Sequence, residues 1–207
     1  GDVKKFGDWK KVHHIIIIPT YKEPISTLKR TLDKLLTQTY PIKHLHIMLS
    51  FEDREGDAAR NKAQALIKEY AHQFGHLWAT YHPDLPGEVK GKSSNTSWGA
   101  KESKRILIDE KGYDIDYVTI TSEDADALLP PQYFACLTYH FLDSPTRYAT
   151  IWQAILQFYN NIWKVPLFVR VFSSSASVML LSTVTRRDRL INFSTYTASL
   201  KMIDAIG

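Results

Sequence analysis

A run of seven residues, V-H-H-I-I-I-I at positions 12–18, constrains the fold of this chain more than any other segment. Five of the seven residues are β-branched, and Pro19 follows directly. An apolar run of this length without polar alternation is typical of a strand that is buried on both faces of a parallel sheet. Because helices must cover both faces of such a sheet, the run indicates an α/β fold.

Four segments of this kind alternate with helical patterns. Strands are predicted over residues 12–18, 44–50, 77–81 and 117–121, and helices over 25–36, 57–73 and 95–107. In the first helix, Leu28, Leu32 and Leu35 recur at helical spacing. Strands that alternate with helices predict a parallel sheet with right-handed crossovers. The chain shows no internal repeat and no low-complexity linker, so we expect a single α/β domain over 1–207.

The second part of the chain has less regular patterns. A helix is predicted over 132–142, an aromatic helix over 148–163, strands over 167–172 and 178–182, and a short closing helix over 197–205. The segment 151–171 is rich in Trp, Phe, Tyr and Leu, and it has two interpretations. It is a buried or half-buried helix followed by a strand, or it is a surface that lies against a membrane or a membrane domain.

The charge and cysteine content of the chain limit which partners and compartments it suits. The net charge of +4 and the isoelectric point near 9.0 suit a phosphate-rich ligand or an anionic membrane surface, without deciding between them. Lys and Arg are scattered rather than clustered, so we expect no nucleic-acid partner. The single Cys136 excludes an intramolecular disulfide and fits a reducing compartment such as the cytoplasm. No signal peptide opens the sequence, and no stretch reaches about 20 uninterrupted apolar residues.

The fourth predicted strand ends in three carboxylates, Glu123, Asp124 and Asp126. Crowded carboxylates repel one another unless a cation lies among them. The D-x-D spacing allows one turn to direct Asp124 and Asp126 at one hard metal ion, and such an ion commonly also binds substrate phosphates. The alternative is a solvated acidic loop, because motifs this short are common.

Polar residues also follow the other predicted strands, and the carboxyl ends of parallel strands meet at one edge of a sheet. These residues are Pro19, Thr20, Tyr21 and Glu23 after the first strand, Glu52, Asp53, Arg54 and Glu55 after the second, and Lys90, Lys92 and Asn95 after the third. Carboxylates can accept hydrogen bonds from a ribose or a base, and lysines can contact phosphates. The combination predicts group transfer from a nucleotide-activated donor.

In this order, the motifs resemble those of the family-2 glycosyltransferases, which have the nucleotide-diphospho-sugar-binding GT-A fold. The segment I-I-I-I-P-T-Y-K-E at 15–23 is similar to the family's first strand and P-x-Y-N-E-type loop, with Lys22 where Asn is commoner. The segment 31–41 resembles the helix and exit that follow, and Glu52 and Asp53 stand at the nucleobase-binding Asp-Asp pair. The segment 90–95 resembles the K-x-x-N segment, and 123–126 resembles the D-x-D. The resemblance covers nearly the whole chain, although each motif alone is weak.

The resemblance implies a Rossmann-like GT-A fold with a mainly parallel central sheet flanked by helices. It also implies a nucleotide-sugar-binding half over 1–127 and an acceptor-side half over 128–207. Donor-binding residues would be Pro19, Thr20, Tyr21, Glu23, Glu52, Asp53, Lys90, Lys92, Asn95 and Asp124, and Asp124 and Asp126 would bind Mn²⁺ or Mg²⁺. Structural interpretations stay open for several of them: a strand end for Thr20 and Tyr21, a helix-terminal charge for Glu23, and a loop and helix cap for Lys92 and Asn95.

The last segment, 192–207, resembles the family's acceptor-side loop and short helix. In the family, this segment leads to an E-D pair whose Asp is the general base. We expect that base beyond Gly207, because Asp204 precedes the I-G turn and is a poor substitute. The resemblance implies a single displacement step that inverts the configuration at the anomeric carbon, without an enzyme-bound nucleophile. Cys136 and the eight histidines therefore have no expected catalytic role.

Three functions compete. The first is an inverting hexosyltransferase domain that uses a UDP-sugar and a carbohydrate or lipid-linked acceptor, within a membrane-bound polysaccharide or glycolipid synthase at the cytoplasmic face of a membrane. The second is a sugar nucleotidyltransferase, which would need a glycine-rich basic loop where this chain has P-T-Y-K-E-P at 19–24. The third is a non-catalytic nucleotide-binding or interaction domain of the same fold. Metal-dependent nucleotide binding distinguishes the first from a pure interaction domain.

Overall fold

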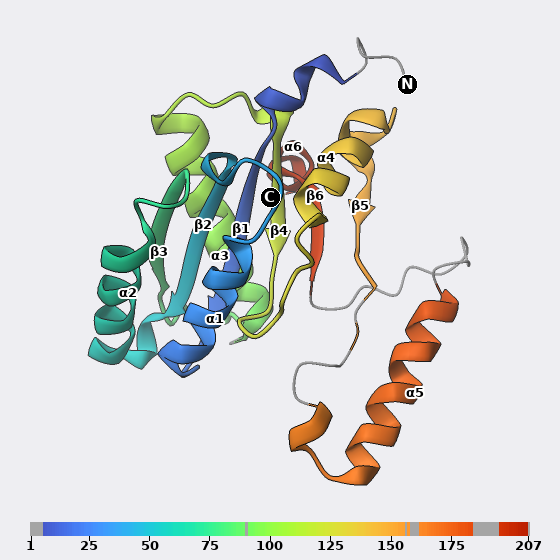
Figure 1. The fold of residues 1–207 in the computed structure, drawn as a ribbon. Helices are drawn as coiled ribbons and strands as arrows, with labels where there is room; N and C mark the ends of the chain where they lie inside the picture. The colour runs from blue at the N-terminus through green and yellow to red at the C-terminus, as the bar shows by residue number, and fades with distance from the viewer. Residues whose placement is uncertain (1–5, 90, 156, 158–161, 184–194, 207) are drawn as a thin grey trace.

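The computed structural model describes residues 6–89, 91–155, 157, 162–183 and 195–206 of the 207-residue chain. One six-stranded sheet runs through the molecule in the order β3-β2-β1-β4-β6-β5, with helices on both faces (Figure 1). The strands are β1 (His13–Thr20), β2 (Leu45–Glu52), β3 (His76–His82), β4 (Val118–Ser122), β5 (Ile151–Trp152) and β6 (Tyr196–Ser199). The first four strands are parallel, and β6 is antiparallel to β4 and β5. The predicted α/β class with a mainly parallel central sheet is confirmed.

The sheet is covered in two layers by α1 (Ile25–Leu35), α2 (Asp57–Tyr70), α3 (Lys92–Lys104), α4 (Tyr133–Asp143) and α6 (Leu200–Ile206). Helix α5 (Leu167–Thr183) stands apart from both layers (Figure 1). Side chains of α1, α2 and α4 share one buried apolar cluster, and side chains of α3 and α6 share a second cluster on the other face. A π-helical turn, Arg105–Glu110, continues α3. The fold therefore has three layers, with the sheet between two layers of helices.

The central position of β1 in the sheet explains why its sequence is so uniformly apolar. Its side chains alternate between the two faces, so Ile16 and Ile18 pack with α1 and α2 while Ile15 and Ile17 pack with α3 and α6. All four isoleucines are at most 1% exposed. Because both faces are covered, neither can be polar.

The order of the strands creates a switch point between β1 and β4. The chain moves outward from β1 to β2 and β3, and it then crosses back to place β4 on the other side of β1. Loops that leave β1 and β4 therefore diverge and open a crevice at their carboxyl ends, which is where open α/β sheets bind ligands.

The predicted elements of the first 143 residues agree with the structure, apart from shifts at their ends. The predictions for the rest are partly wrong. Residues 167–183 form the single helix α5 instead of two strands, and Ile151–Trp152 forms a strand where a long aromatic helix was expected. Tyr196–Ser199 forms β6, so the closing helix begins only at Leu200. Part of the expected aromatic helix lies outside the described residues.

Tertiary pairing accounts for the strands that were missed. The edge of β4 that faces away from β1 needs a partner for its backbone N–H and C=O groups, and β6 supplies it through Thr119↔Ser199 to Ser122↔Tyr196. Local propensity does not contain that information. In α5, the β-branched and aromatic residues favour a strand, yet their spacing suits one face of a helix. Within the described residues, none of the helices has both the length and the apolar character needed to cross a membrane.

Candidate functional site

A cavity of about 760 Å³ lies at the carboxyl edge of the sheet, where the loops after β1, β2 and β4 meet the first turns of α1 and α3. This volume falls within the usual range of small-molecule sites. It is lined by Pro19, Thr20, Tyr21, Glu23, Ser26, Thr27, Arg30, Glu52, Arg54, Gly91, Lys92, Asn95, Asp124, Ala125 and Asp126. Nine residues singled out from the sequence therefore surround one cavity, at the switch point of the sheet.

The loop after β1 is held by the side chain of Glu23. Its Oε2 accepts a hydrogen bond from the Thr20 hydroxyl at 2.7 Å and another from the backbone N–H of Tyr21. Between them, Lys22 adopts a left-handed backbone conformation with φ of 65°, which is uncommon for a residue other than glycine. Glu23 thus fixes the conformation that places Thr20 and Tyr21 at the cavity, rather than merely adding charge to α1.

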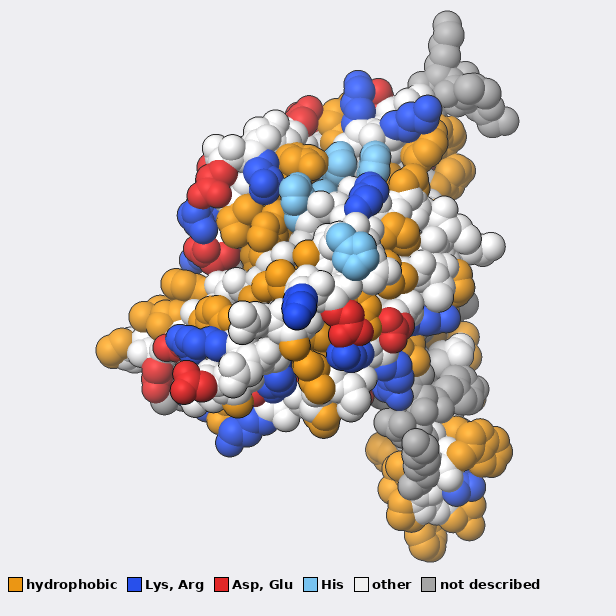
Figure 2. All heavy atoms as spheres, turned by 60° about the vertical axis from the view of Figure 1, so that its left-hand side comes forward, with side chains coloured by type: hydrophobic (Ala, Val, Ile, Leu, Met, Phe, Trp, Pro, Cys, Tyr) orange, Lys and Arg blue, Asp and Glu red, His pale blue; other side chains and the backbone are white. Residues whose placement is uncertain are grey.

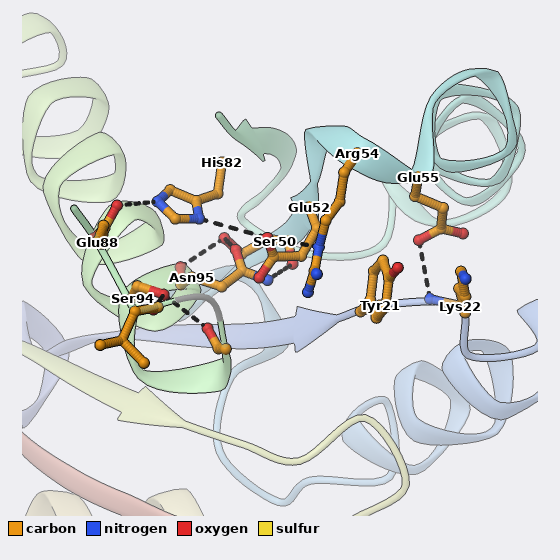
Figure 3. Close-up of polar contacts among 12 residues, drawn as sticks. Tyr21, Lys22, Ser50, Glu52, Arg54, Glu55, His82, Glu88, Ser94 and Asn95 are labelled. Carbon is orange, nitrogen blue, oxygen red and sulfur yellow. Dashed lines mark hydrogen bonds and ion pairs between the residues drawn. The ribbon is translucent and has the colours of Figure 1, made fainter. Parts of the chain in front are cut away.

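A second carboxylate, Glu55, supports the same loop from the other side. Its Oε2 accepts a hydrogen bond from the Lys22 N–H at 3.0 Å, as Figure 3 shows. Glu55 also forms an ion pair with Lys62 of α2, and Lys62 donates to the backbone carbonyl of Glu23 at 3.0 Å. Both side chains of this ion pair are largely buried, which limits solvent screening. The strained turn at Lys22 is therefore stabilised by contacts from β2–α2, which no local sequence signal indicates.

Tyr21 and Arg54 form a stacked pair at the cavity. The Arg54 guanidinium lies 4.1 Å from the centre of the Tyr21 ring, and its Nε lies 3.6 Å from Oε2 of Glu52. Figure 3 shows the three side chains next to one another. A planar ring and a planar cation in this arrangement offer stacking surfaces for a nucleobase, and the guanidinium can also pair with a phosphate.

Glu52 connects the cavity to a buried histidine. The Glu52 side chain is only 7% exposed, and its Oε2 lies 3.6 Å from Nδ1 of His82, which is an ion-pair distance but too long for a hydrogen bond. On the other side of the ring, Nε2 of His82 lies 3.0 Å from Glu88 (Figure 3). A donor on a bound ligand could therefore be met by a carboxylate that is shielded from water and correspondingly strong as an acceptor.

Opposite charges meet at the D-x-D motif. Lys92, the first residue of α3, forms an ion pair with Asp124, and both side chains are about one third exposed. Asp126 is more exposed and lines the same cavity. Both α1 and α3 begin at this cavity, and within the described structure no side chain caps either helix. Their first-turn N–H groups and helix dipoles favour an anion such as a phosphate.

The donor set at this motif fits a divalent cation that is shared with a ligand. Within the described residues, no group of three or more His, Cys, Asp or Glu side chains could hold a metal ion. Mg²⁺ and Mn²⁺ are commonly bound by only one or two carboxylates, with phosphates and waters completing the coordination. Asp124 and Asp126 supply two hard oxygen donors of that kind. Lys92 would then exchange its contact with Asp124 for a phosphate.

Asn95 lines the cavity but has a structural contact as well. It is 2% exposed, and its side-chain amide accepts a hydrogen bond from the Ser50 hydroxyl at 2.7 Å and donates to the Ser50 carbonyl at 2.8 Å. These bonds attach the first turn of α3 to β2. They therefore place Lys92, one turn earlier, beside Asp124.

Two other residues from the sequence motifs, Asp53 and Glu123, lie elsewhere, and the position of a third is not described. Asp53 is not among the lining residues, and its carboxylate pairs with Arg60 at 2.6 Å. Lys90 lies outside the described residues. Glu123 is fully buried and also does not line the cavity, so only two of the three crowded carboxylates reach it.

Sequence reasoning missed three polar residues that line the cavity, namely Ser26, Thr27 and Arg30, and it placed Arg54 at a strand end without giving it a role. Ser26 and Arg30 stand one turn apart in α1, at i and i+4, and this spacing was the available signal. Arg54 directly follows the Glu52–Asp53 pair, but the direction of its side chain depends on the stacking with Tyr21.

A second cavity, of about 780 Å³, shares Lys92 with the first. It lies between α3, β4, β6 and α6, and its lining combines apolar residues such as Ile120 and Leu200 with Lys101 and Lys104. Ser122, the last residue of β4, also lines it. The two cavities therefore meet beside the D-x-D motif.

Comparison with known proteins supports the fold. No protein-family model matches the sequence, and no curated protein matches it either. Among solved structures, the chain is similar to the mannosyltransferase PcManGT from Pyrobaculum calidifontis in complex with GDP-Man and Mn²⁺, with a TM-score of 0.60 and 14% identity over 99% of this chain and 52% of that one. It also matches mouse xyloside xylosyltransferase 1 in its apo form, with a TM-score of 0.41 and 12% identity over 93% of this chain and 68% of that one.

The likeness to the mannosyltransferase shows that this chain has the fold of a glycosyltransferase of the GT-A type. The chain spans about half the length of that protein. At 14% identity, the likeness concerns the fold, so the activity has to be argued from the site itself.

Proposed function

We propose that this domain is an inverting, metal-assisted glycosyltransferase of family 2, which transfers a sugar from a nucleotide-diphospho-sugar to an acceptor hydroxyl. The observation that carries the proposal is the single cavity in which Tyr21, Glu52, Lys92, Asp124 and Asp126 meet. Stacking groups, a shielded carboxylate, cations and a pair of hard oxygen donors are together what a nucleotide diphosphate requires.

In this proposal, the nucleoside lies at the end of the cavity formed by the β1 and β2 loops. Tyr21 and Arg54 provide stacking surfaces, and Glu52 accepts hydrogen bonds from the base or the ribose. Glu23 and Glu55 hold the loop in shape. We place Thr20 beside the nucleoside as a polar contact.

The diphosphate would lie toward the D-x-D motif. Lys92 and Arg30 can pair with its oxygens, and the first turns of α1 and α3 present N–H groups to it. Asp124 and Asp126 would hold Mn²⁺ or Mg²⁺ together with the phosphates. When bound, the cation would neutralise charge on the departing nucleoside diphosphate. These residues therefore favour the state in which the glycosidic bond to the phosphate is broken.

The acceptor side requires a base to remove the proton of the attacking hydroxyl. Asp204 does not suit this role, because it lies on α6 and forms an ion pair with Lys104 at 3.6 Å. The proposed acceptor is a carbohydrate or a lipid-linked sugar.

Calorimetric titration with UDP and GDP, each with and without Mn²⁺, tests the proposal. We expect one of the two nucleotides to bind, and Mn²⁺ to tighten its binding at least about tenfold because the cation bridges phosphate and carboxylate. Replacing Asp126 with Asn should remove most of this increase. UDP is the proposed nucleotide, and tighter binding of GDP would revise only the identity of the base.

Asp57→Asn provides the matched control, since Asp57 is an exposed carboxylate at the start of α2 and does not line the cavity. This variant should keep the full effect of Mn²⁺. An unchanged Mn²⁺ effect in Asp126→Asn would contradict the metal role. Absence of heat with both nucleotides would contradict donor binding and favour the non-catalytic interaction domain.

A further inference from the structure

Helix α5 exposes its apolar side chains to solvent. Six of them are at least 60% exposed, which is unusual for large apolar residues on one helix. They are Leu167 (68%), Phe168 (86%), Val171 (60%), Phe172 (78%), Val178 (65%) and Met179 (65%). Counted from Leu167, the other five follow at one, four, five, eleven and twelve residues, and this spacing places all six on one face of the helix.

The other face of α5 combines Ser173, Ala176 and Ser177 with Val169 and Leu180, and it is the better covered one. Ser177 is only 3% exposed, and its hydroxyl bonds back to the Ser173 carbonyl at 2.9 Å. A helix that packs on a protein core instead turns its largest apolar side chains inward. The orientation of α5 therefore indicates an apolar surrounding on its outer side.

A side-chain contact fixes the turn before α5 to the helix. Arg170 donates from Nε to the Val165 carbonyl at 2.9 Å and from Nη2 to the Trp163 carbonyl at 3.0 Å. Its guanidinium also lies 5.4 Å from the centre of the Trp163 ring, which is 81% exposed. Trp163 and α5 thus form one unit with a tryptophan at its end, and tryptophan favours the interface between water and lipid.

The sequence around α5 is mainly basic. Between Asp143 and Asp188 it carries no acidic residue. Its basic residues are Arg147, Lys164, Arg170, Arg186 and Arg187. Apolar and aromatic residues next to basic ones are the composition of helices that lie on anionic lipid. An acidic protein surface could also attract the charges, but it would not account for six large apolar side chains facing outward.

The position of α5 relates it to the candidate site. Figure 1 shows the helix standing apart from the helix layers, beyond the edge of the sheet at which β1 leads into α1. Figure 2 shows hydrophobic side chains on the same projecting part at the bottom of the molecule. That edge of the sheet carries the cavity lined by Thr20, Glu52 and Asp124.

We infer that α5 is a membrane-docking helix that lies along a bilayer containing anionic lipid. Its Leu167–Met179 face would be buried at the boundary between the lipid headgroups and the acyl chains. At 17 residues it is about 26 Å long, and lying flat it would anchor the cavity edge close to the lipid headgroups. This role rests on the expected location of the domain at the cytoplasmic face of a membrane, where anionic lipid would be the partner of α5. A membrane-anchored acceptor would then be held near the donor cavity.

Flotation with lipid vesicles tests the inference without any nucleotide, so its failure would leave the donor-binding proposal untouched. The protein is mixed with vesicles of phosphatidylcholine alone or of phosphatidylcholine with phosphatidylglycerol. We expect flotation with the anionic vesicles, and weaker flotation at high salt because screening reduces the attraction of the basic residues. Phe168→Ser/Phe172→Ser should lower partitioning at least about tenfold, since each phenylalanine would otherwise leave water.

The matched control is Val89→Ser/Ile206→Ser, because these two apolar residues are 84% and 73% exposed but lie away from α5. It should float like the unaltered protein. A second pair on the docking face, Leu167→Ser/Val171→Ser, should behave like the phenylalanine pair. Circular dichroism and thermal unfolding of each variant show that the fold is kept.

Several outcomes would overturn the inference. Equal flotation with neutral and anionic vesicles would remove the role of charge, and no flotation with either would remove the bilayer as partner. Flotation of the phenylalanine variant like that of the unaltered protein would show that α5 does not dock. Dimerisation that depends on Phe168 and Phe172 without vesicle binding, measured by light scattering, would identify a second copy of the chain as the partner of α5.

Discussion

Glu123 directly precedes the two aspartates at the cavity and has a different environment from both. It is 0% exposed, and neither carboxylate oxygen has a hydrogen-bond partner within the described structure. Burial, followed by the nearby charge of Asp124, raises the pKa of the Glu123 carboxyl well above its ordinary value. The side chain is therefore neutral over a range of pH in which a solvated glutamate is charged.

Replacing Glu123 with Gln should make the protein less sensitive to rising pH. In the unfolded chain Glu123 ionises near pH 4.5, whereas in the folded protein it retains its proton to higher pH. The unaltered protein therefore loses stability as pH rises above about 4.5, by up to about 1.4 kcal/mol per pH unit, until the folded-state pKa is reached. Urea unfolding at pH 4 and pH 8 should show similar stability of the two proteins at pH 4 and a more stable variant at pH 8.

The exposed Asp57→Asn variant serves as the control, and its stability should follow that of the unaltered protein at both pH values. If Glu123→Gln gained no stability between pH 4 and pH 8, the carboxyl of Glu123 would be ionised in the folded protein, in contact with a cation or water.

At the scale of elements, the entry into β3 depends on close packing against β2. Gly75 donates from its backbone N–H to the Leu45 carbonyl at 2.9 Å. A Cβ atom at this position would lie 2.3 Å from the carbonyl oxygen of Lys43 and 2.6 Å from Cε1 of His46. His46 is 0% exposed, so it has little space to move.

Gly75→Ala should therefore destabilise the protein by about 1–3 kcal/mol, because either the β2–β3 register or the His46 ring must shift. Gly7→Ala is the matched control, since a Cβ at Gly7 meets nothing within 4 Å. It should change the free energy of unfolding by less than about 0.5 kcal/mol. Chemical denaturation measures both, and equal stability of the two variants would show that the start of β3 adapts without cost.

At the scale of the whole molecule, the two edges of the sheet have different chemistry. The carboxyl edge carries the candidate site, and the amino edge carries a group of histidines. The His13 ring stacks on His44 at 4.4 Å, its Nδ1 lies 3.0 Å from Nε2 of His46, and His46 stacks on His76 at 5.1 Å. Figure 2 shows histidine side chains gathered on the upper part of the molecule. Burial first, and then neighbouring histidine charges, lower the pKa of His13 to about 4 and of His46 to about 2.

The protein should accordingly lose stability in mild acid. A histidine whose folded-state pKa lies below the unfolded value of 6.5 takes up a proton in the unfolded chain first. Stability is therefore present above about pH 6.5 and falls as the pH drops toward 4, by up to about 1.4 kcal/mol per pH unit for each such histidine. Urea unfolding at pH 7, 6 and 5 measures this slope.

His14 provides the variant for this measurement. Burial lowers the pKa of its ring to about 3, and the ring bonds to the hydroxyls of Thr119 at 2.6 Å and Thr138 at 2.8 Å. His14→Gln retains an amide that can bond to either hydroxyl, and it should make the slope below pH 6.5 shallower. His72→Gln, at an exposed position, should leave the slope unchanged. An equal slope in His14→Gln and the unaltered protein would contradict the explanation.

The apolar patterning was enough to predict the central part of the fold, because both faces of β1 are covered and its four isoleucines therefore could not alternate with polar residues. It also predicted which loops converge, since parallel strands end at one edge. It did not determine β6 or α5. The first exists because β4 needs a partner, and the second turns its apolar face outward, which spacing alone does not reveal.

The candidate site divides in the same way. Tyr21, Glu52, Asp124 and Asp126 could be named from motifs at the strand ends, and the structure brings them around one cavity. Arg54 and Glu55 could be listed after the second strand but not given a role, and Lys62 could not be named at all. Contacts between residues distant in sequence direct these side chains. The sequence grouped Glu123 with Asp124 and Asp126, whereas the packing buries Glu123 and leaves its two neighbours at the cavity.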